Sequence, residues 1–222
     1  MLKAIAFKEW LKMRWTFLAM VVVCIGMTVN IALDLSHLMT MERPINVWSY
    51  VILMQYPFYS SLRYIPLLVG CAIAVAQFVP EVIQSRLKLS LHLPLGENQV
   101  LLWMVGYGGC VVAGLLLLEM LAMMVVALAY FPKEVMQSMV LTMAPWFLAG
   151  LGGYFLTSTI VVEPRWVRRV FLILLAYGFL DALVLRVAIT AYTPSLLWFV
   201  LLTVLTTIGV VLSGHRFRKG VR

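Results

Sequence analysis

The chain has 222 residues, of which 64% are hydrophobic and 12% are charged, and its net charge is +8. Soluble domains are roughly half apolar and a quarter charged, so this composition excludes an ordinary soluble protein. Long apolar runs separated by short polar stretches predict an all-α, polytopic membrane protein. The runs leave too few residues for a soluble domain, and we expect one transmembrane domain over residues 1–222.

Residues 1–14 are predicted to form an amphipathic helix at the membrane surface. Lys3, Lys8, Lys12 and Arg14 are interspersed with apolar residues that include Trp10. Lysine side chains reach lipid headgroups, and tryptophan favours the membrane interface. The apolar run that follows, at about residues 15–35, is too long for a cleaved signal peptide and is expected to be the first span.

Five further spans are expected, which makes about six in total. Their approximate ranges are 62–80, 100–130, 136–162, 168–190 and 195–214. The first connection, residues 36–61, is rich in tryptophan and tyrosine and is expected to lie at the outer membrane boundary with a short helix. The second connection, residues 81–98, separates the second and third spans.

The positions of the cations predict the orientation of these spans. Thirteen of the 17 Lys and Arg residues fall in the N-terminal segment, the second and fourth connections and the tail, namely Lys3, Lys8, Lys12, Arg14, Arg86, Lys88, Arg165, Arg168, Arg169, Arg216, Arg218, Lys219 and Arg222. Cytoplasmic loops are enriched in Lys and Arg, so both termini are predicted to be cytoplasmic. The positive charge is therefore assigned to membrane topology, and no nucleic-acid partner is expected.

No motif points to catalysis by this chain. The sequence contains no GxxxxGK[ST] phosphate-binding loop and no GxSxG or HExxH pattern. Cys24, Cys71 and Cys110 lie in apolar runs and are expected to be small buried residues. We expect no enzymatic activity, no cofactor and no metal site in the chain itself.

Three ionisable residues lie inside expected spans: Glu119, Asp181 and Arg186. Such residues normally face a partner or a wet cavity. Glu119 and Arg186 lie at similar depth, so an ion pair between their helices is one interpretation. A polar lining for a substrate path is the other.

Small residues recur at helical spacing in two expected spans. Gly106, Cys110 and Gly114 do so in the third, and Gly150 and Gly153 lie in the fourth. Such ridges let helix backbones approach closely. They would serve packing within one chain or a dimer interface, and the sequence does not choose between these.

The connection at 81–98 contains a second amphipathic pattern. Ile83, Leu87 and Leu91 recur every four residues, polar residues that include Arg86 lie between them, and Pro94 then ends the helical pattern. Such a helix would either rest on lipid or dock into a groove of a soluble partner.

The whole arrangement resembles the type-two permease subunits of ATP-binding-cassette (ABC) transporters. The resemblance is carried by the basic amphipathic segment LKAIAFKEWLKMRW, the six spans, and a first cytoplasmic connection, EVIQSRLKLSLHLPLGEN, that begins with glutamate and contains L-x-L-P. It implies that this connection is a coupling helix that contacts a separate ATPase subunit. The residues to which it assigns this docking role are Glu81, Ile83, Arg86, Leu87, Leu91 and Pro94.

The resemblance also implies a function and partners. The chain would be the permease subunit of an exporter in a bacterial inner membrane, paired with a second copy or a paralogue. ATP and magnesium would bind the ATPase subunit. One departure is that residues 190–194 leave little room for the family's outer helices between the last two spans. The alternatives are a non-transporting membrane scaffold, or an ion-coupled carrier that uses Glu119 and Asp181 as a proton relay.

Overall fold

A computed structural model of the chain describes residues 2–42, 44–52, 57–83, 97–185 and 192–219. Within these ranges the chain is all-helical, as predicted, and contains no β-strand. The elements are α1 (Leu2–Met41), α2 (Pro44–Ile52), η1 (Ser60–Tyr64), α3 (Ile65–Ile83), α5 (Glu97–Tyr130), α6 (Lys133–Val162), α7 (Trp166–Val184), η2 (Thr193–Ser195) and α8 (Leu196–Lys219).

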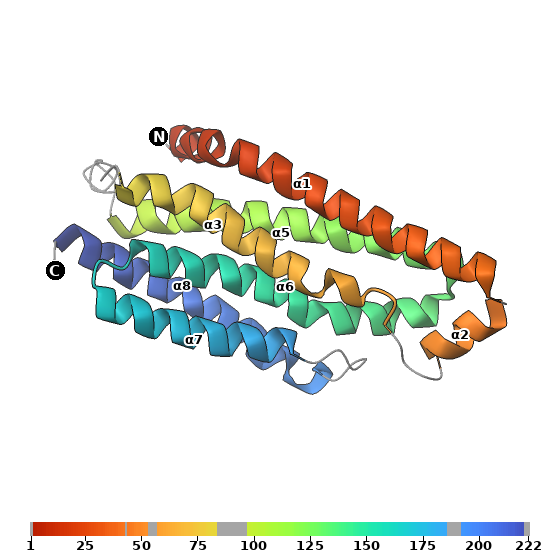
Figure 1. The fold of residues 1–222 in the computed structure, drawn as a ribbon. Coiled ribbons are helices and arrows are strands. Elements are labelled where there is room, and N and C mark those ends of the chain that lie inside the picture. Colours follow the sequence, from red (N-terminus) through yellow and green to blue (C-terminus); the bar gives the residue numbers. More distant parts are fainter. Residues whose placement is uncertain (1, 43, 53–56, 84–96, 186–191, 220–222) are drawn as a thin grey trace.

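The long helices form an elongated bundle in which successive helices run in opposite directions (Figure 1). The first and last helices, α1 and α8, have their outer termini at one end, where α3 ends and α5 begins. We call this end, which contains Leu2, Ile83, Glu97 and Lys219, the terminal end. The opposite end, which contains Met41, Tyr130 and Lys133, is the far end.

Five of the described helical stretches are long and apolar enough to cross a membrane. They are Ile5–Met41, Ser60–Ile83, Gln99–Tyr130, Lys133–Val162 and Thr193–Phe217. The remaining long helix, α7, has 19 residues and includes Arg168, Arg169 and Asp181. With three charged residues in so short a helix, α7 is less uniformly apolar than the apolar stretches of the other five.

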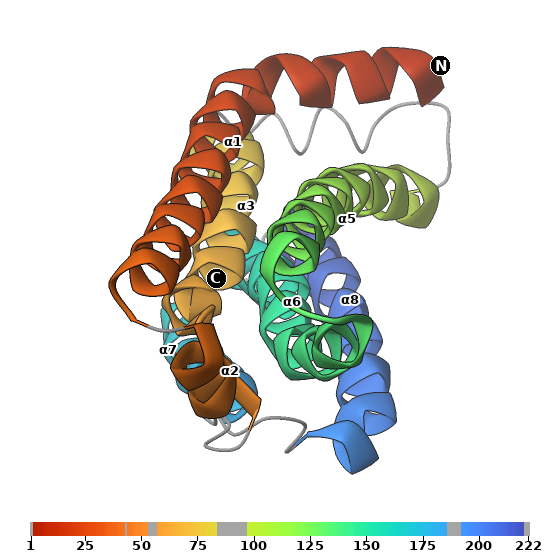
Figure 2. The same cartoon turned by 90° about the vertical axis from the view of Figure 1, so that its right-hand side faces the viewer.

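Helix α1 is longer than a single span requires. Its 40 residues extend over about 60 Å, twice the roughly 30 Å of a bilayer core. The expected surface segment 1–14 and the expected span 15–35 are thus parts of one continuous helix. The first turns cross the long axis of the bundle before the helix turns to run along it (Figure 2).

Helix α6 is the centre of the bundle because it packs against α3, α5, α7 and α8. The closest approach is between α6 and α3, where two glycines face each other. A Cβ atom built on Gly70 would lie 1.9 Å from the carbonyl oxygen of Gly150. A Cβ on Gly150 would lie 2.6 Å from the carbonyl oxygen of Pro66, so the contact requires glycine in both helices.

The aromatic stretch 36–61 has a packing role in addition to any interfacial one. It contains the predicted short helix, α2. Trp48 and Tyr50 are exposed, but Tyr59 is buried, with its ring centre 5.9 Å from that of Trp146. Phe58 stacks on Phe131 at 5.2 Å. From composition, we expected the aromatic side chains of this stretch at the membrane boundary. Some of them instead pack against each other and against α6, and they partly close the far end.

Candidate functional site

The predicted docking residues divide between exposed, buried and undescribed positions. Ile83, in the last turn of α3, is 75% exposed. The side chain of Glu81 has no exposed surface. Arg86, Leu87, Leu91 and Pro94 lie outside the described residues. In this arrangement the Glu81 side chain contacts its own chain, so it also has a role within the protein.

That role is an ion-pair cluster between α1 and α3. The Lys8 ammonium lies 2.8 Å from Oε1 of Glu81, and the Lys12 ammonium lies 2.9 Å from the same oxygen. Lys12 also lies 2.7 Å from Oε1 of Glu9, whose side chain is buried. Two cations and two carboxylates therefore balance, and they fix the crosswise part of α1 to the last turn of α3.

The cluster continues into the bundle through Gln77 and Tyr154. The Gln77 amide donates to Oε2 of Glu9 at 2.9 Å and to the carbonyl oxygen of Met104 at 2.8 Å. The Tyr154 hydroxyl donates to Oε1 of Gln77 at 2.7 Å. We call Lys8, Glu9, Lys12, Gln77, Glu81 and Tyr154 the polar network; it joins α1, α3, α5 and α6.

A glycine in α5 leaves space for the polar network. A Cβ atom on Gly108 of α5 would lie 2.1 Å from the Tyr154 hydroxyl and 2.2 Å from Oε1 of Gln77. A larger residue at this position would displace one partner of the hydrogen bond. In α3, Gln77 and Glu81 are four residues apart, so both side chains project from one face of the helix. Lys8 and Lys12 have the same spacing in α1.

Replacing Tyr154 with phenylalanine is expected to lower the free energy of unfolding by about 1–3 kcal/mol. The change removes a buried hydroxyl and leaves Oε1 of Gln77 without its donor. Thermal unfolding of the purified protein in detergent measures the loss. Tyr177→Phe is the matched control because Tyr177 is 72% exposed, and equal melting temperatures for the two variants would contradict the prediction.

A second polar cluster at the terminal end holds α6, α7 and α8 together. Glu163 follows α6 and is buried. It accepts a hydrogen bond from Ser213 at 2.8 Å, and the Arg216 guanidinium lies 3.4 Å from the same oxygen. Arg169 donates to the Glu163 carbonyl at 2.7 Å. The start of α7 and the end of α8 are thereby fixed to the end of α6.

Two of the three ionisable residues of the expected spans, Glu119 and Asp181, lie in the described part of the chain, and their surroundings differ. Glu119 is buried and accepts a hydrogen bond from Thr28 of α1 at 3.0 Å. Asp181 is exposed on α7, which packs on α6. Arg186 lies outside the described residues, so its expected pairing with Glu119 remains a prediction. The proton relay through Glu119 and Asp181 likewise stays a prediction.

Cysteine burial was predicted correctly only in part. Cys24 is buried, Cys71 is half-buried and Cys110 is exposed on α5, where the prediction was wrong. All three are free thiols. Among the described residues, no group of three or more His, Cys, Asp or Glu side chains could hold a metal ion.

Sequence reasoning missed Glu9, Gln77 and Tyr154. A signal existed for two of them: Glu9 is the only acidic residue among the first 33, and Gln77 is a lone amide in an apolar run. Polar residues in such positions seek partners. The described contacts of the polar network join α1 to α3 and α3 to α6, and they hold these helices in register. No known protein family matches the chain, and no curated protein or solved structure matches it.

Proposed function

We propose that this chain is the membrane subunit of an ATP-driven ABC exporter and works with a separate ATPase subunit. In this proposal α1, α3, α5, α6, α7 and α8 each cross a bacterial inner membrane, and both termini are cytoplasmic. A second copy or a paralogue completes the membrane part. The ATPase subunit binds ATP and magnesium and docks on residues 81–94.

The observation that carries the proposal is the ion-pair cluster at Glu81. The connection that we assign to the ATPase begins at Glu81, in the last turn of α3. Lys8 and Lys12 hold the crosswise part of α1 to this turn. A force applied to the connection would therefore move α3 and α1 together, as rigid elements joined by a packed contact.

The surface of the N-terminal part of α1 supports its place at a membrane interface. Phe7, Leu11 and Trp15 are 64%, 44% and 69% exposed, whereas Glu9 and Met13 are buried. Glu9 and Lys12 thus face protein, whereas Phe7, Leu11 and Trp15 form an outward apolar surface that the exposed Arg14 borders. An amphipathic helix in the headgroup region inserts such a surface into lipid.

The distribution of cations over the described residues supports a cytoplasmic terminal end. Lys8, Lys12, Arg168, Arg169 and Arg216 belong to helices or turns at that end (Figure 1). Helix α7 is about 28 Å long, enough to cross the hydrocarbon region. Its two arginines lie in the first turn, from which they can reach the headgroups.

Docking on the second connection can be tested by changing its apolar stripe. The double variant Leu87→Glu, Leu91→Glu is expected to lose the co-purifying ATPase, because two carboxylates would enter an apolar contact. The measurement is ATP hydrolysis, inhibited by vanadate, in complexes purified through a tag on this chain. Leu38→Glu, an exposed position on α1, is the matched control and should keep full hydrolysis.

Two results would refute the proposal. One is a wild-type chain that purifies folded but without any ATP-hydrolysing subunit. The other is a double variant that retains its subunit and its hydrolysis. Transport that persists without ATP and stops when the proton gradient is removed would identify the ion-coupled carrier instead. A stable complex that hydrolyses ATP but moves no substrate would identify the scaffold.

A further inference from the structure

A groove with one buried carboxylate lies between α1 and α5. It encloses about 280 Å³ and is lined by Val21, Cys24, Ile25, Thr28, Val29, Leu115, Leu118, Glu119 and Ala122. Ile25 and Leu118 on its rim are 58% and 62% exposed. In a bilayer the groove would therefore open sideways into the hydrocarbon.

Glu119 gives this groove a defined polar group. The side chain is only 4% exposed, and Oε1 accepts a hydrogen bond from the Thr28 hydroxyl at 3.0 Å. Cys24 lines the same groove. No Lys, Arg or His lines the groove, and the ion pairs of the described residues do not include Glu119. The Thr28 hydroxyl orients the carboxyl group, and no cationic side chain among the lining residues pairs with it.

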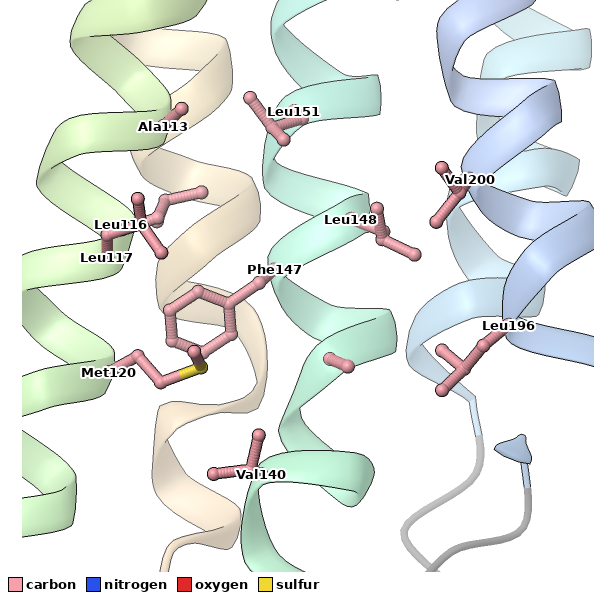
Figure 3. A pocket seen from close by; sticks show the side chains of 11 residues that line it. Ala113, Leu116, Leu117, Met120, Val140, Phe147, Leu148, Leu151, Leu196 and Val200 are labelled. Atoms are coloured by element: carbon pink, nitrogen blue, oxygen red, sulfur yellow. The ribbon is translucent and has the colours of Figure 1, made fainter. Parts of the chain in front are cut away.

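A second, larger groove has no polar group comparable to Glu119. It lies between α5, α6 and α8, encloses about 410 Å³ and is lined by apolar side chains throughout (Figure 3). Phe147 and Met120 project into it, but no lining side chain carries a hydrogen-bonding group. Lipid chains satisfy such a surface without selectivity, because they are as apolar as the side chains.

We propose that the groove between α1 and α5 binds a lipophilic organic cation, with Glu119 as the counter-ion. A carboxylate at this depth is costly without an opposite charge, and an ammonium group on an apolar ligand supplies that charge in a low-dielectric setting. The aliphatic walls receive the first part of the apolar body, and the remainder lies in the lipid. The volume is at the lower end of ligand sites and suits a head group with a short length of chain.

This inference goes beyond the proposed function because it requires a membrane-embedded chain but no ATPase partner. Binding can be measured on the chain alone, so its failure is distinguishable from failure to recruit an ATPase. If both hold, the cation is the class of substrate that the exporter would take from the membrane.

The test is binding of radiolabelled dodecyltrimethylammonium to the full chain in lipid nanodiscs, with empty nanodiscs as the partition background. We expect saturable binding that excess unlabelled cation displaces and dodecanol does not. Glu119→Gln should weaken binding about tenfold or more, as loss of a buried charge partner does. The amide oxygen can still accept from Thr28, so this variant should keep the wild-type melting temperature.

Matched variants separate the groove from its surroundings. Ala122→Leu fills the groove and should weaken binding with Glu119 intact, whereas Ala144→Leu, in the larger apolar groove, should not. Asp181→Asn removes an exposed intramembrane carboxylate and should leave binding unchanged. Equal binding by wild type and Glu119→Gln would overturn the proposal. Binding to the wild type that does not exceed the lipid background would also overturn it. In that case, a disulfide between two Ile25→Cys chains would identify a second copy of this chain as the occupant of the groove.

Discussion

Replacing Lys12 with methionine is expected to lower the free energy of unfolding by about 3–5 kcal/mol, the cost of removing one partner from a buried charge pair. Its ammonium lies within 2.9 Å of two carboxylates whose side chains have no exposed surface. Methionine fills a similar volume, so the effect reports lost charge more than lost packing. Unfolding by dodecyl sulfate in mixed micelles measures the difference.

A second substitution tests whether the loss comes from the charge on Glu9. Lys8 still pairs with Glu81 in the Lys12→Met protein, whereas Glu9 keeps only its hydrogen bond from Gln77. Adding Glu9→Gln removes that unpaired charge and should recover more than half of the loss. Lys133→Met, at an exposed position of the far end, is the control and should change stability little. A Lys12→Met cost as small as that of Lys133→Met would show that water solvates the network.

The class of fold could be predicted from the sequence because it depends on apolar length alone. Runs of this length need a lipid-like environment, and helices satisfy their own backbone hydrogen bonds there. The expected range 136–162 lies within α6, and 100–130 lies within α5. One boundary was less accurate: the second span was expected to end at about residue 80, but α3 continues through Pro80 to Ile83. A proline removes one hydrogen bond, which an otherwise favourable apolar helix tolerates.

The pairing of helices could not be predicted, because lipid-facing and protein-facing surfaces are about equally apolar. No amphipathic face marks which neighbour a span will meet, in contrast to helices of soluble proteins. Depth in the membrane suggested Arg186 as a partner for Glu119, which stays a prediction because Arg186 lies outside the described residues, and nothing in the sequence pointed to the contact with Thr28. Depth fixes one coordinate of a side chain, and several helices present residues at the same level.

Some residues of the polar network were singled out from the sequence, but their contacts with each other were not predicted. Basic residues near the N-terminus and the glutamate at the end of α3 were both singled out, each for a contact outside the chain. They contact each other, over a separation of 69 residues between Lys12 and Glu81. Opposite charges that flank two apolar spans can pair with each other or with external groups, and sequence order does not distinguish these.

Replacing Gly70 with alanine is expected to lower the free energy of unfolding by about 3 kcal/mol, the upper part of the range for overpacking a close-packed interior. The added Cβ would lie 1.9 Å from the Gly150 carbonyl oxygen and 3.1 Å from the Tyr154 nitrogen, both backbone atoms. A side chain could rotate away, but here α3 and α6 must move apart. The same detergent unfolding assay measures the change.

The displacement should also weaken the polar network, because Tyr154 lies one turn beyond Gly150 in α6. Tyr154→Phe should therefore cost less in the Gly70→Ala protein than in the wild type, a non-additivity expected only of coupled contacts. Gly114→Ala is the control, since a Cβ there meets nothing within 4 Å, and the better helix propensity of alanine should leave that variant as stable as wild type or more so. If Gly70→Ala were as stable as Gly114→Ala, α3 and α6 would not be in backbone contact. The central packing position that we assign to α6 would then be wrong.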